Sequence, residues 1–541
     1  MKIDLSQFHG IAPLINPLAL GEGFAQKAIN CDLRGGVLAP MRGPLTVATS
    51  PVANAVSLYK FGWQNELDTQ WWFTFNQDVD VAHAGYPGDI EERTYFTGPW
   101  PAAPGGLKKT RLGLGNSGTG PYPSFYLDGS VPAPTSTPTV VASGGTATVT
   151  PESRVYTETF VTSWDEESEP GPASARVLVN QGGTVALSGL TAAPAGSNTV
   201  DRRRIYRSSY TGTDASDAQL VVELPITQTS YSDTKLQIDL ADTLATRGWD
   251  AAPAGLAGLI SHPSQFLSGF KDFDVYFSEP GAPYAWPLTY QQSAGAPVMG
   301  LGMMGQTLVV LTRDLPMIGV GSTPEDINLQ RVEVANNCRS CLGKRGIVSA
   351  PGGVFYQTRH GLALITPSGA RLVTEEYMGE DNFAAYSPAT ALGAMWGSRY
   401  VSFHSGGGLI YDPEIKGMVE TTVTATAKHE RNGRLFMCSG ANISAFGEGA
   451  VIPYTWRSRK FHAQRLVAMA VGKVVADSYP VTVNLICDDL VVATKTVADA
   501  YEFMLPLARP GRVFELEVTG TAKVRRVAVA ESIEELQDVG A

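Results

Sequence analysis

The sequence predicts an all-β protein: a β-propeller with an inserted immunoglobulin-like sandwich and a C-terminal β-sandwich-like unit. Five segments of the second half each combine an apolar strand, a tight turn and another apolar strand, and their turns lie 42, 46, 46 and 34 residues apart. A period of roughly 40–50 residues with strands in each unit is typical of propeller blades. The 57 Gly and 35 Pro are spread along the chain, which favours short strands joined by turns over helices. The five segments are 266–277, 307–320, 354–365, 400–411 and 435–446.

Residues 1–50 predict an N-terminal arm and a first hairpin. Pro and Gly interrupt this stretch throughout, and its best helical candidate is the short piece 23–31 (GFAQKAINC). We expect the arm either to close the ring of blades or to embrace a neighbouring subunit.

Residues 51–132 predict the first part of the propeller, because they carry the aromatic strand patterns SLYKFGW, QWWFTFN and RTYFTG. The run 70–84 (QWWFTFNQDVDVAHA) is similar to the later hairpins. Trp71 and Trp72 would point to opposite faces of one strand. We therefore expect one of them in the core and the other against a neighbouring subunit or a sugar.

Residues 133–237 predict an immunoglobulin-like or fibronectin type III-like insertion. The Pro-rich run VPAPTSTP indicates a linker, and turn signals then recur at the spacing of a sandwich domain. The run RVYTETFVTSWDEESEPGPAS is similar to fibronectin type III domains. We expect its acidic residues after Trp164 to form an exposed turn with solvated carboxylates, because adjacent loop acids are seldom a catalytic pair.

Residues 238–452 predict the remainder of the propeller, and residues 453–541 predict a C-terminal β domain. Alternation such as VTVNLI in the latter indicates a strand with two different faces. The domain ends in a short acidic helix, ESIEELQD at 532–538.

No catalytic, cofactor-binding or metal-binding residue is predicted, and we expect a protein that is not an enzyme. Cys338 and Cys341 form a lone C-x-x-C, whereas a structural zinc site needs two further Cys or His ligands, so we expect free thiols without metal. The spacing G-x-G-x-x-G occurs at 113–118 and 300–305. Neither copy has the strand before it and the helix after it that a dinucleotide site requires, so we interpret both as glycine turns.

The two histidines nearest to predicted turns have structural interpretations. We expect His360 to be a polar turn residue and His404 a hydrogen-bonded histidine of a sheet. The net charge is −11, which is not the charge of a nucleic-acid-binding protein. Small basic clusters are expected to be solvated strand faces or subunit contacts; they lie at 108–111, 202–204 and 457–460.

The chain shows no sign of a membrane or secretory segment. No apolar run approaches the ~18–20 residues of a membrane span. Met1 opens on the polar stretch KIDLSQF, so we expect no signal peptide and folding in a cytoplasm.

Three parts of the chain resemble the tail nozzle, or tail tubular, proteins of short-tailed bacteriophages. They are FHGIAPLINPLALGEGFAQKAINCDLRGGVLAPMRGP near the start, LAGLISHPSQFLSGFKDFDVYFSEPGAPYAWP with VMGLGMMGQTLVVLTRDLPMIGVGS in the middle, and TWRSRKFH, VVADSYP and ESIEEL near the end. The resemblance implies a β-propeller protomer in a homohexameric ring at the tip of the virion tail. It also implies synthesis in the host cytoplasm, other tail proteins (an adaptor and tail fibres) as partners, and genomic DNA that passes the channel without specific binding.

Electrostatics agrees with a conduit, because an acidic wall repels phosphate and gains nothing from counterion release. Closed rings with head-to-tail interfaces are the expected symmetry of such an assembly. Two alternatives remain. One is another tail or head–tail connector component. The other, from a different class, is a carbohydrate-binding propeller protein that acts on the host surface, although the Asp-box turns of glycan-cleaving propellers are missing.

Overall fold

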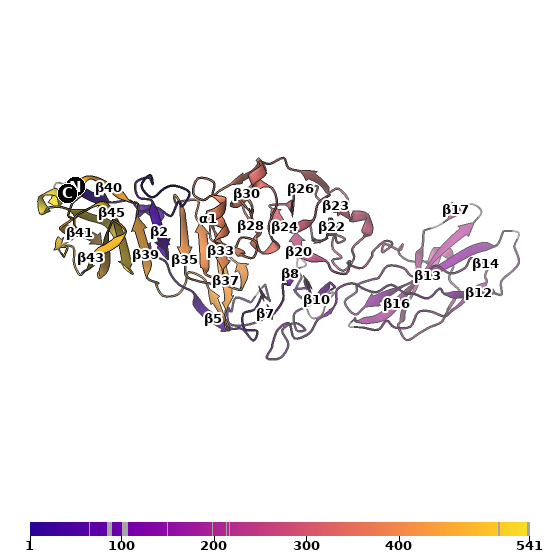
Figure 1. The fold of residues 1–541 in the computed structure, drawn as a ribbon. Coiled ribbons are helices and arrows are strands. Elements are labelled where there is room, and N and C mark those ends of the chain that lie inside the picture. The colour runs from indigo at the N-terminus through magenta and orange to yellow at the C-terminus, as the bar shows by residue number, and fades with distance from the viewer. Residues whose placement is uncertain are drawn as a thin grey trace. The chain divides into compact units, whose positions relative to one another are not determined.

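The computed structural model describes residues 1–63, 65–83, 89–99, 106–148, 150–196, 198–211, 214–215, 217–506 and 509–537. These residues form strands β1 to β46 and only two short α-helices, so the predicted all-β class is confirmed (Figure 1). The chain divides into two compact units. Unit 1 comprises Met1–Asn76, Met299–Ile318 and Arg331–Ala541, and unit 2 comprises Gln77–Val298 and Gly319–Gln330. No helix in the described part of the chain is long and apolar enough to cross a membrane.

All five predicted hairpins are present, four of them as the two central strands of a four-stranded sheet and the fifth, at 400–411, within a larger sheet. Both faces of these strands are buried: in β33, for example, Tyr400, Val401 and Phe403 are each at most 2% exposed. A strand with both faces buried has a continuous run of apolar residues in its sequence, as expected in blades that stack face to face. The hairpins are β21 (Phe266–Lys271) with β22 (Asp274–Phe277), β25 (Thr307–Thr312) with β26 (Met317–Val320), β29 (Gly353–Gln357) with β30 (Leu362–Thr366), β33 (Arg399–His404) with β34 (Gly407–Tyr411), and β37 (Arg434–Ser439) with β38 (Asn442–Ala445).

Outer strands complete each of these small sheets. They are β20 (Ala257–His262), β23 (Gln292–Ser293), β24 (Val298–Met304), β27 (Asn328–Arg331), β28 (Val348–Ala350), β31 (Gly369–Leu372), β32 (Leu392–Trp396), β35 (Met418–Thr421) and β36 (Ala427–Arg431). Two further sheets precede them in sequence: β6 (Ser57–Lys60) with β7 (Trp72–Phe75), and β8 (Asp80–His83), β9 (Thr94–Thr97), β10 (Lys108–Thr110) and β11 (Leu127–Asp128). Helix α1 (Glu380–Ala384) lies between β31 and β32 in sequence.

The run 70–84 does not form the single hairpin that its pattern suggested. Its first strand, β7, pairs with β6, and its second, β8, pairs with β9. Residue 84, at its end, lies outside the described residues.

Two hairpin strands begin at a glycine for a steric reason. Gly353 opens β29 with φ 157°, and Gly407 opens β34 with φ 144°. A Cβ atom would overlap with the carbonyl oxygen of Ile365 in the first case and of Thr421 in the second. Only glycine adopts such a conformation without strain.

The N-terminal residues pair with strands from the end of the chain, within unit 1. β5 (Leu45–Thr49) is the fourth strand of the sheet of β36, β37 and β38. β1 (Lys2–Leu5) pairs with β46 (Val524–Ala530), and β2 (Ala25–Ile29) pairs with β39 (Tyr454–Ser458). The piece 23–31 is therefore a strand, and the expectation of a helix there was wrong.

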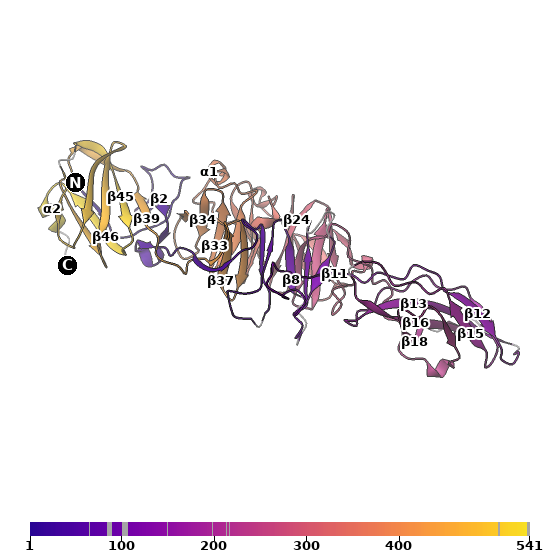
Figure 2. The same cartoon turned by 90° about the horizontal axis from the view of Figure 1, so that it is seen from below.

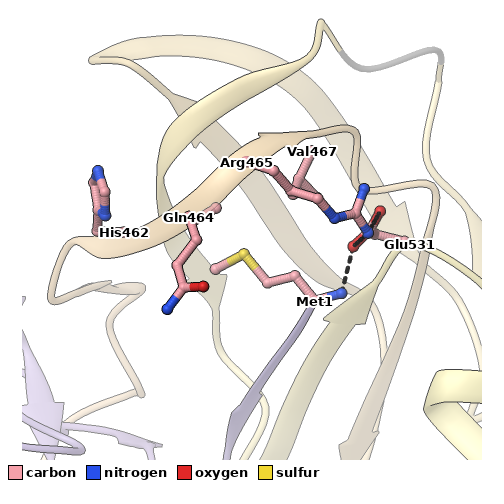
Figure 3. A pocket seen from close by; sticks show the side chains of 7 residues that line it. Met1, His462, Gln464, Arg465, Val467 and Glu531 are labelled. Carbon is pink, nitrogen blue, oxygen red and sulfur yellow. Dashed lines mark hydrogen bonds and ion pairs between the residues drawn. The ribbon is translucent and has the colours of Figure 1, made fainter.

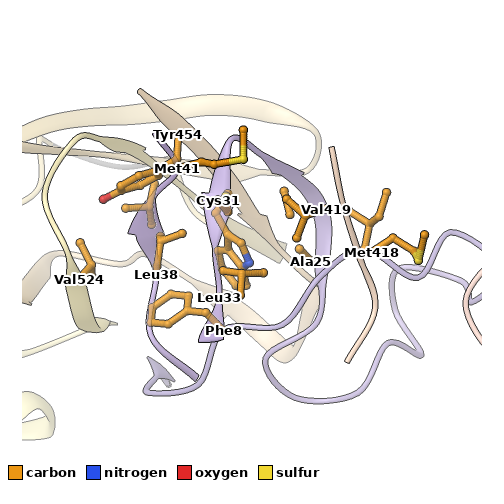
Figure 4. Close-up of a cluster of buried hydrophobic side chains, with 14 of the residues drawn as sticks. Phe8, Ala25, Cys31, Leu33, Leu38, Met41, Met418, Val419, Tyr454 and Val524 are labelled. Carbon is orange, nitrogen blue, oxygen red and sulfur yellow. The ribbon is translucent and has the colours of Figure 1, made fainter. Parts of the chain in front are cut away.

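The C-terminal region is built from two sheets around one core. The first contains β1, β46, β41 (Val471–Ala476) and β44 (Phe503–Met504). The second contains β2, β39, β45 (Gly511–Gly520), β42 (Val481–Cys487), β43 (Leu490–Val497) and β40 (Phe461–Val467), and a single bridge continues it into β35. Figure 4 shows Phe8, Cys31 and Leu38 from the N-terminal segment packed with Tyr454 and Val524. The short pair β3 (Cys31–Asp32) and β4 (Ala39–Pro40) and the helix α2 (Ile533–Gln537) complete the region; Asp538 of the predicted helix lies outside the described residues.

The predicted insertion is a two-sheet sandwich within unit 2. One sheet contains β12 (Thr139–Ser143), β15 (Thr184–Ser188) and β19 (Tyr231–Asp233), and Figure 2 shows β12 and β15 side by side. The other contains β14 (Val177–Val179), β13 (Glu152–Thr162), β16 (Val200–Thr211), β17 (Asp214–Ala215) and β18 (Gln219–Pro225). Side chains from both sheets share one apolar cluster, which includes Tyr156, Val185, Leu187 and Ile205.

Candidate functional site

The C-x-x-C cysteines lie in the apolar interior of unit 1. Cys338 and Cys341 are 1% and 2% exposed, belong to the same apolar cluster as Val309 and Tyr356, and form no disulfide. Burial raises the pKa of the Cys341 thiol to about 12, so this thiol stays protonated and packs as an apolar group. The Tyr356 hydroxyl donates a hydrogen bond to the Cys338 carbonyl oxygen at 2.6 Å. Among the described residues, no group of three or more His, Cys, Asp or Glu side chains is arranged to hold a metal ion.

The two glycine motifs have different structures, and neither opens a helix. The first, 113–118, is a turn in which the amides of Leu114 and Gly115 donate to the Arg111 carbonyl oxygen. The second begins within β24, so the prediction of a turn was wrong for Gly300 and Gly302. A Cβ atom at Gly300 would collide with the side chain of Ile347, and one at Gly302 with that of Val354 on β29, which explains why glycine stands there.

The two predicted structural histidines have local partners. The Nδ1 atom of His404 accepts the Gly406 amide at 3.2 Å, and burial lowers the pKa of its imidazole. His360 lies in a turn, as predicted, with its Nδ1 atom 3.0 Å from a carboxylate oxygen of Glu380. Both therefore have structural roles in hairpins.

Of the two adjacent tryptophans, Trp72 is the buried one, at 4% exposed. Trp71 is half-buried, has φ 55°, and lies with its ring 6.0 Å from the Lys60 ammonium. His429 packs nearby, with its imidazole edge-on to Tyr59 at 5.0 Å and to Trp72 at 6.0 Å. These contacts form an aromatic cluster around a half-buried histidine.

We expect this histidine to make the protein less stable in mild acid. Burial, followed by nearby positive charges, lowers the pKa of His429 to about 3. The nearby cations are Arg431, Lys428 and Lys60. An unfolded histidine has a pKa of about 6.5. Between these two pKa values the unfolded state therefore binds more protons than the folded state. The contribution of His429 to the free energy of unfolding is fully present above pH ~6.5 and decreases as the pH falls below this value.

The measurement is the free energy of unfolding in urea at pH 7.5 and pH 5, for the wild type and for His429→Gln. Between these two values the wild type should lose ~1–2 kcal/mol more than the variant. An equal loss in both proteins would contradict the role of His429, because the titration of carboxylates elsewhere lowers the stability of both proteins by the same amount.

The structure corrects the expectation for two of the basic clusters. Arg203 is fully buried, and its Nη1 atom lies 2.8 Å from the Glu158 carboxylate. Lys109 is 2% exposed and pairs with Glu166. Neither is a solvated surface residue, because each neutralises a carboxylate inside unit 2. In the third cluster, the Arg457 guanidinium pairs at 2.6 Å with a buried glutamate of β45.

The acidic run after Trp164 is also not the exposed turn that was expected. Glu166, Glu167 and Ser168 are 1%, 8% and 2% exposed. The chain reverses tightly at the end of β13, where the Glu166 amide donates to the hydroxyl of Thr162 at 3.2 Å. This reversal turns the carboxylates inward, toward cations from other strands.

These inward carboxylates belong to a group of buried ion pairs and hydrogen bonds in unit 2. Glu167 accepts hydrogen bonds from Thr159 at 2.6 Å and Tyr206 at 2.7 Å, and Arg204 lies 2.5 Å from its other oxygen. Three donors thus converge on one carboxylate, as in a structural network. Sequence reasoning missed it because Lys109 and Glu166 are 57 positions apart.

A shallow pocket of about 490 Å³ lies beside β40 in the C-terminal region (Figure 3). Both carboxylate oxygens of Glu531 accept from Arg465 Nη2 at 2.9 Å, and the Met1 amine also donates to Glu531. These groups neutralise one another, and the remaining polar lining comes from His462 and Gln464. Such a lining offers neither an activated nucleophile nor a metal-binding set.

Comparisons with known proteins give no family for the chain. No protein-family model matches it, and no curated protein does. Solved structures match weakly. BamB from Moraxella catarrhalis has 10% identity and a TM-score of 0.21, with 46% of this chain and 79% of that chain covered. PorZ, a surface component of the type-IX secretion system of Porphyromonas gingivalis, has 10% identity and a TM-score of 0.26, with 88% and 82% covered.

A third structure is the extracellular domain of the two component system BT4673 from B. thetaiotaomicron, with 9% identity and a TM-score of 0.27. That match covers 54% of this chain and 40% of the other, so this chain spans less than half of that structure's length. Likeness at this level identifies neither an activity nor a partner.

Proposed function

We propose that the chain is a structural protein of a bacteriophage tail that forms a homohexameric ring, the nozzle through which the genome leaves the virion. The observation that carries the proposal is the sequence resemblance of three separate stretches to tail nozzle proteins. These stretches include β2 to β4, β20 to β22, β24 to β26, and β39 with the start of β40. The resemblance thus falls on strands of the blade-like sheets and of the C-terminal region.

The internal pairing of the basic clusters supports a channel that does not grip DNA. Arg202 lies 2.6 Å from Asp165 and 3.1 Å from Glu223, and Arg204 lies 2.8 Å from Glu223. Guanidinium groups held by carboxylates are poor partners for phosphate, and the net charge of −11 adds repulsion. The role is non-enzymatic and needs no cofactor.

The test is electron microscopy and native mass spectrometry of the purified protein, with immunogold labelling of virions. We expect rings of six copies, label at the tail tip, and no shift of duplex DNA in a gel at physiological salt. Label at the head–tail junction would favour a connector component instead. A monomer on a side fibre, or salt-sensitive DNA binding that Arg202→Gln abolishes, would refute the nozzle. Retention on host polysaccharide without ring formation would favour the carbohydrate-binding alternative.

A further inference from the structure

One lysine connects the inserted sandwich with the sheet that precedes it in the chain. Lys109 lies on β10, directly opposite Tyr95 on β9. Its ammonium donates to the carboxylate of Glu166, which follows β13 of the sandwich, and to the carbonyl oxygen of Gly129 at 3.2 Å. The Lys109 and Glu166 side chains are 3% and 1% exposed, so water does not screen this pair.

Trp164, two residues before this glutamate, adds a second set of contacts at the same place. Its ring centroid lies 4.6 Å from the Arg111 guanidinium, 5.8 Å from that of Arg93 and 5.5 Å from the Lys109 ammonium. Cations over an indole ring attract it, and the attraction grows when water is excluded. Trp164 is 5% exposed, so the sandwich presents this ring to the β8–β11 sheet and not to solvent.

Three further hydrogen bonds lie at the joint between the sandwich and the rest of unit 2. The Tyr95 hydroxyl donates to Glu166 at 3.5 Å, and the Glu167 amide donates to the Tyr284 hydroxyl at 3.4 Å. The two connections of the sandwich also meet, because the amide of Ala252 donates to the Ser130 hydroxyl at 3.0 Å. The sandwich is thus attached by its turn as well as by its covalent linkers.

Two apolar clusters can be described on the two sides of this joint. The cluster of Tyr95, Leu107 and Trp286 shares no described residue with the sandwich cluster of Tyr156 and Ile205. The contacts described above at the joint are an ion pair, cation–π pairs and hydrogen bonds. Because removing one member of a buried ion pair leaves an uncompensated charge, such a joint depends strongly on that pair.

We infer that the inserted sandwich is a docked arm, held in one orientation on the β8–β11 sheet by the Lys109–Glu166 pair, and not a freely tethered decoration. The inference does not depend on the proposed function, since it concerns contacts within unit 2. Its physical consequence is a rigid arm that presents its far end at a fixed distance from the β8–β11 sheet of unit 2.

The test measures a distance within unit 2 by double electron–electron resonance. Spin labels at Leu178→Cys on the sandwich and Phe273→Cys on the β21–β22 turn replace side chains that are 58% and 49% exposed. The five native cysteines are buried and should not react. The labelled full-length chain is compared with the same chain carrying Glu166→Ala or Lys109→Met. Glu223→Ala is the matched control, because it removes an acid of the same sandwich that faces solvent and not the joint.

We expect one narrow distance distribution in the wild type and in the control, and a distribution about twofold broader or more in both joint variants. Hydrogen exchange of β13 and β16 serves as the folding check and should stay slow in Lys109→Met, which removes no sandwich residue. A broad distribution in the wild type, or an unchanged one in a folded Lys109→Met, would overturn the inference. Either result would leave ring formation and tail location untouched, so it is distinguishable from failure of the nozzle proposal.

Discussion

Replacing Glu158 by alanine is expected to destabilise the inserted sandwich by about 3–5 kcal/mol. Glu158 on β13 and Arg203 on β16 are both fully buried, 2.8 Å apart. Arg203 also donates to the carbonyl oxygens of Thr191 at 2.8 Å and Ile226 at 2.6 Å, and the Thr191 amide donates to Glu158 at 2.7 Å. Removing the carboxylate leaves a guanidinium charge and an amide without their acceptor in an apolar setting.

Urea-dependent hydrogen exchange of the β13 and β16 amides in the full-length protein measures this loss. Glu223→Ala, which breaks solvent-facing ion pairs on the same sheet, should cost ~0–1 kcal/mol. The double change Glu158→Leu with Arg203→Met should recover most of the stability, since apolar residues of similar volume often replace buried ion pairs without loss. If Glu158→Ala loses no more stability than Glu223→Ala, the Glu158–Arg203 pair is not needed for the stability of the sandwich.

Replacing Trp456 by alanine is expected to cost about 3–5 kcal/mol in unit 1 and to release the N-terminal arm. The Trp456 side chain is fully buried, and its ring meets Phe8 edge-on at 5.0 Å. Its Nε1–H donates to the carbonyl oxygen of His9 at 3.0 Å. The variant therefore loses a large apolar contact and the hydrogen bond that ties the arm to β39.

The readout is the urea midpoint together with hydrogen exchange of β1 and β2, which should become fast in Trp456→Ala. Trp63→Ala provides the control, because Trp63 is 68% exposed and its removal should change stability by less than ~0.5 kcal/mol. Equal midpoints for the two variants would mean that the arm is held by other contacts.

The sequence predicted the hairpins well because their signal is local. In 400–411, strands buried on both faces give continuous apolar runs, and a run of three glycines begins in the turn between them and continues into β34. The strand β2 was missed for the opposite reason. Its segment AQKAI has good helix formers, but pairing with β39, more than 400 positions away, decides its conformation.

The buried ion pairs could not be predicted for a similar reason. Glu166 lies in an acidic run whose composition is typical of a solvated loop. Nothing near it in the sequence indicates that Lys109 is its partner. Arg203 stands between two half-buried arginines, and strand alternation indicates only that its side chain points to the other face. Sequence patterns therefore located the strands, whereas the charges inside the protein required the three-dimensional arrangement.

The pairing of β5 with β38 has a consequence for the order of events on the ribosome. The two strands are separated by roughly 400 residues, which take about 20–80 seconds to synthesise at typical rates. Unit 2 lies wholly between them and can fold during this interval, whereas β1, β2 and β5 wait for partners that emerge after it. The nascent chain therefore carries unpaired strands through most of its translation. The emergence of β38, β39 and β46, and not the appearance of the first blade, is the step at which β5, β2 and β1 find their partners in unit 1.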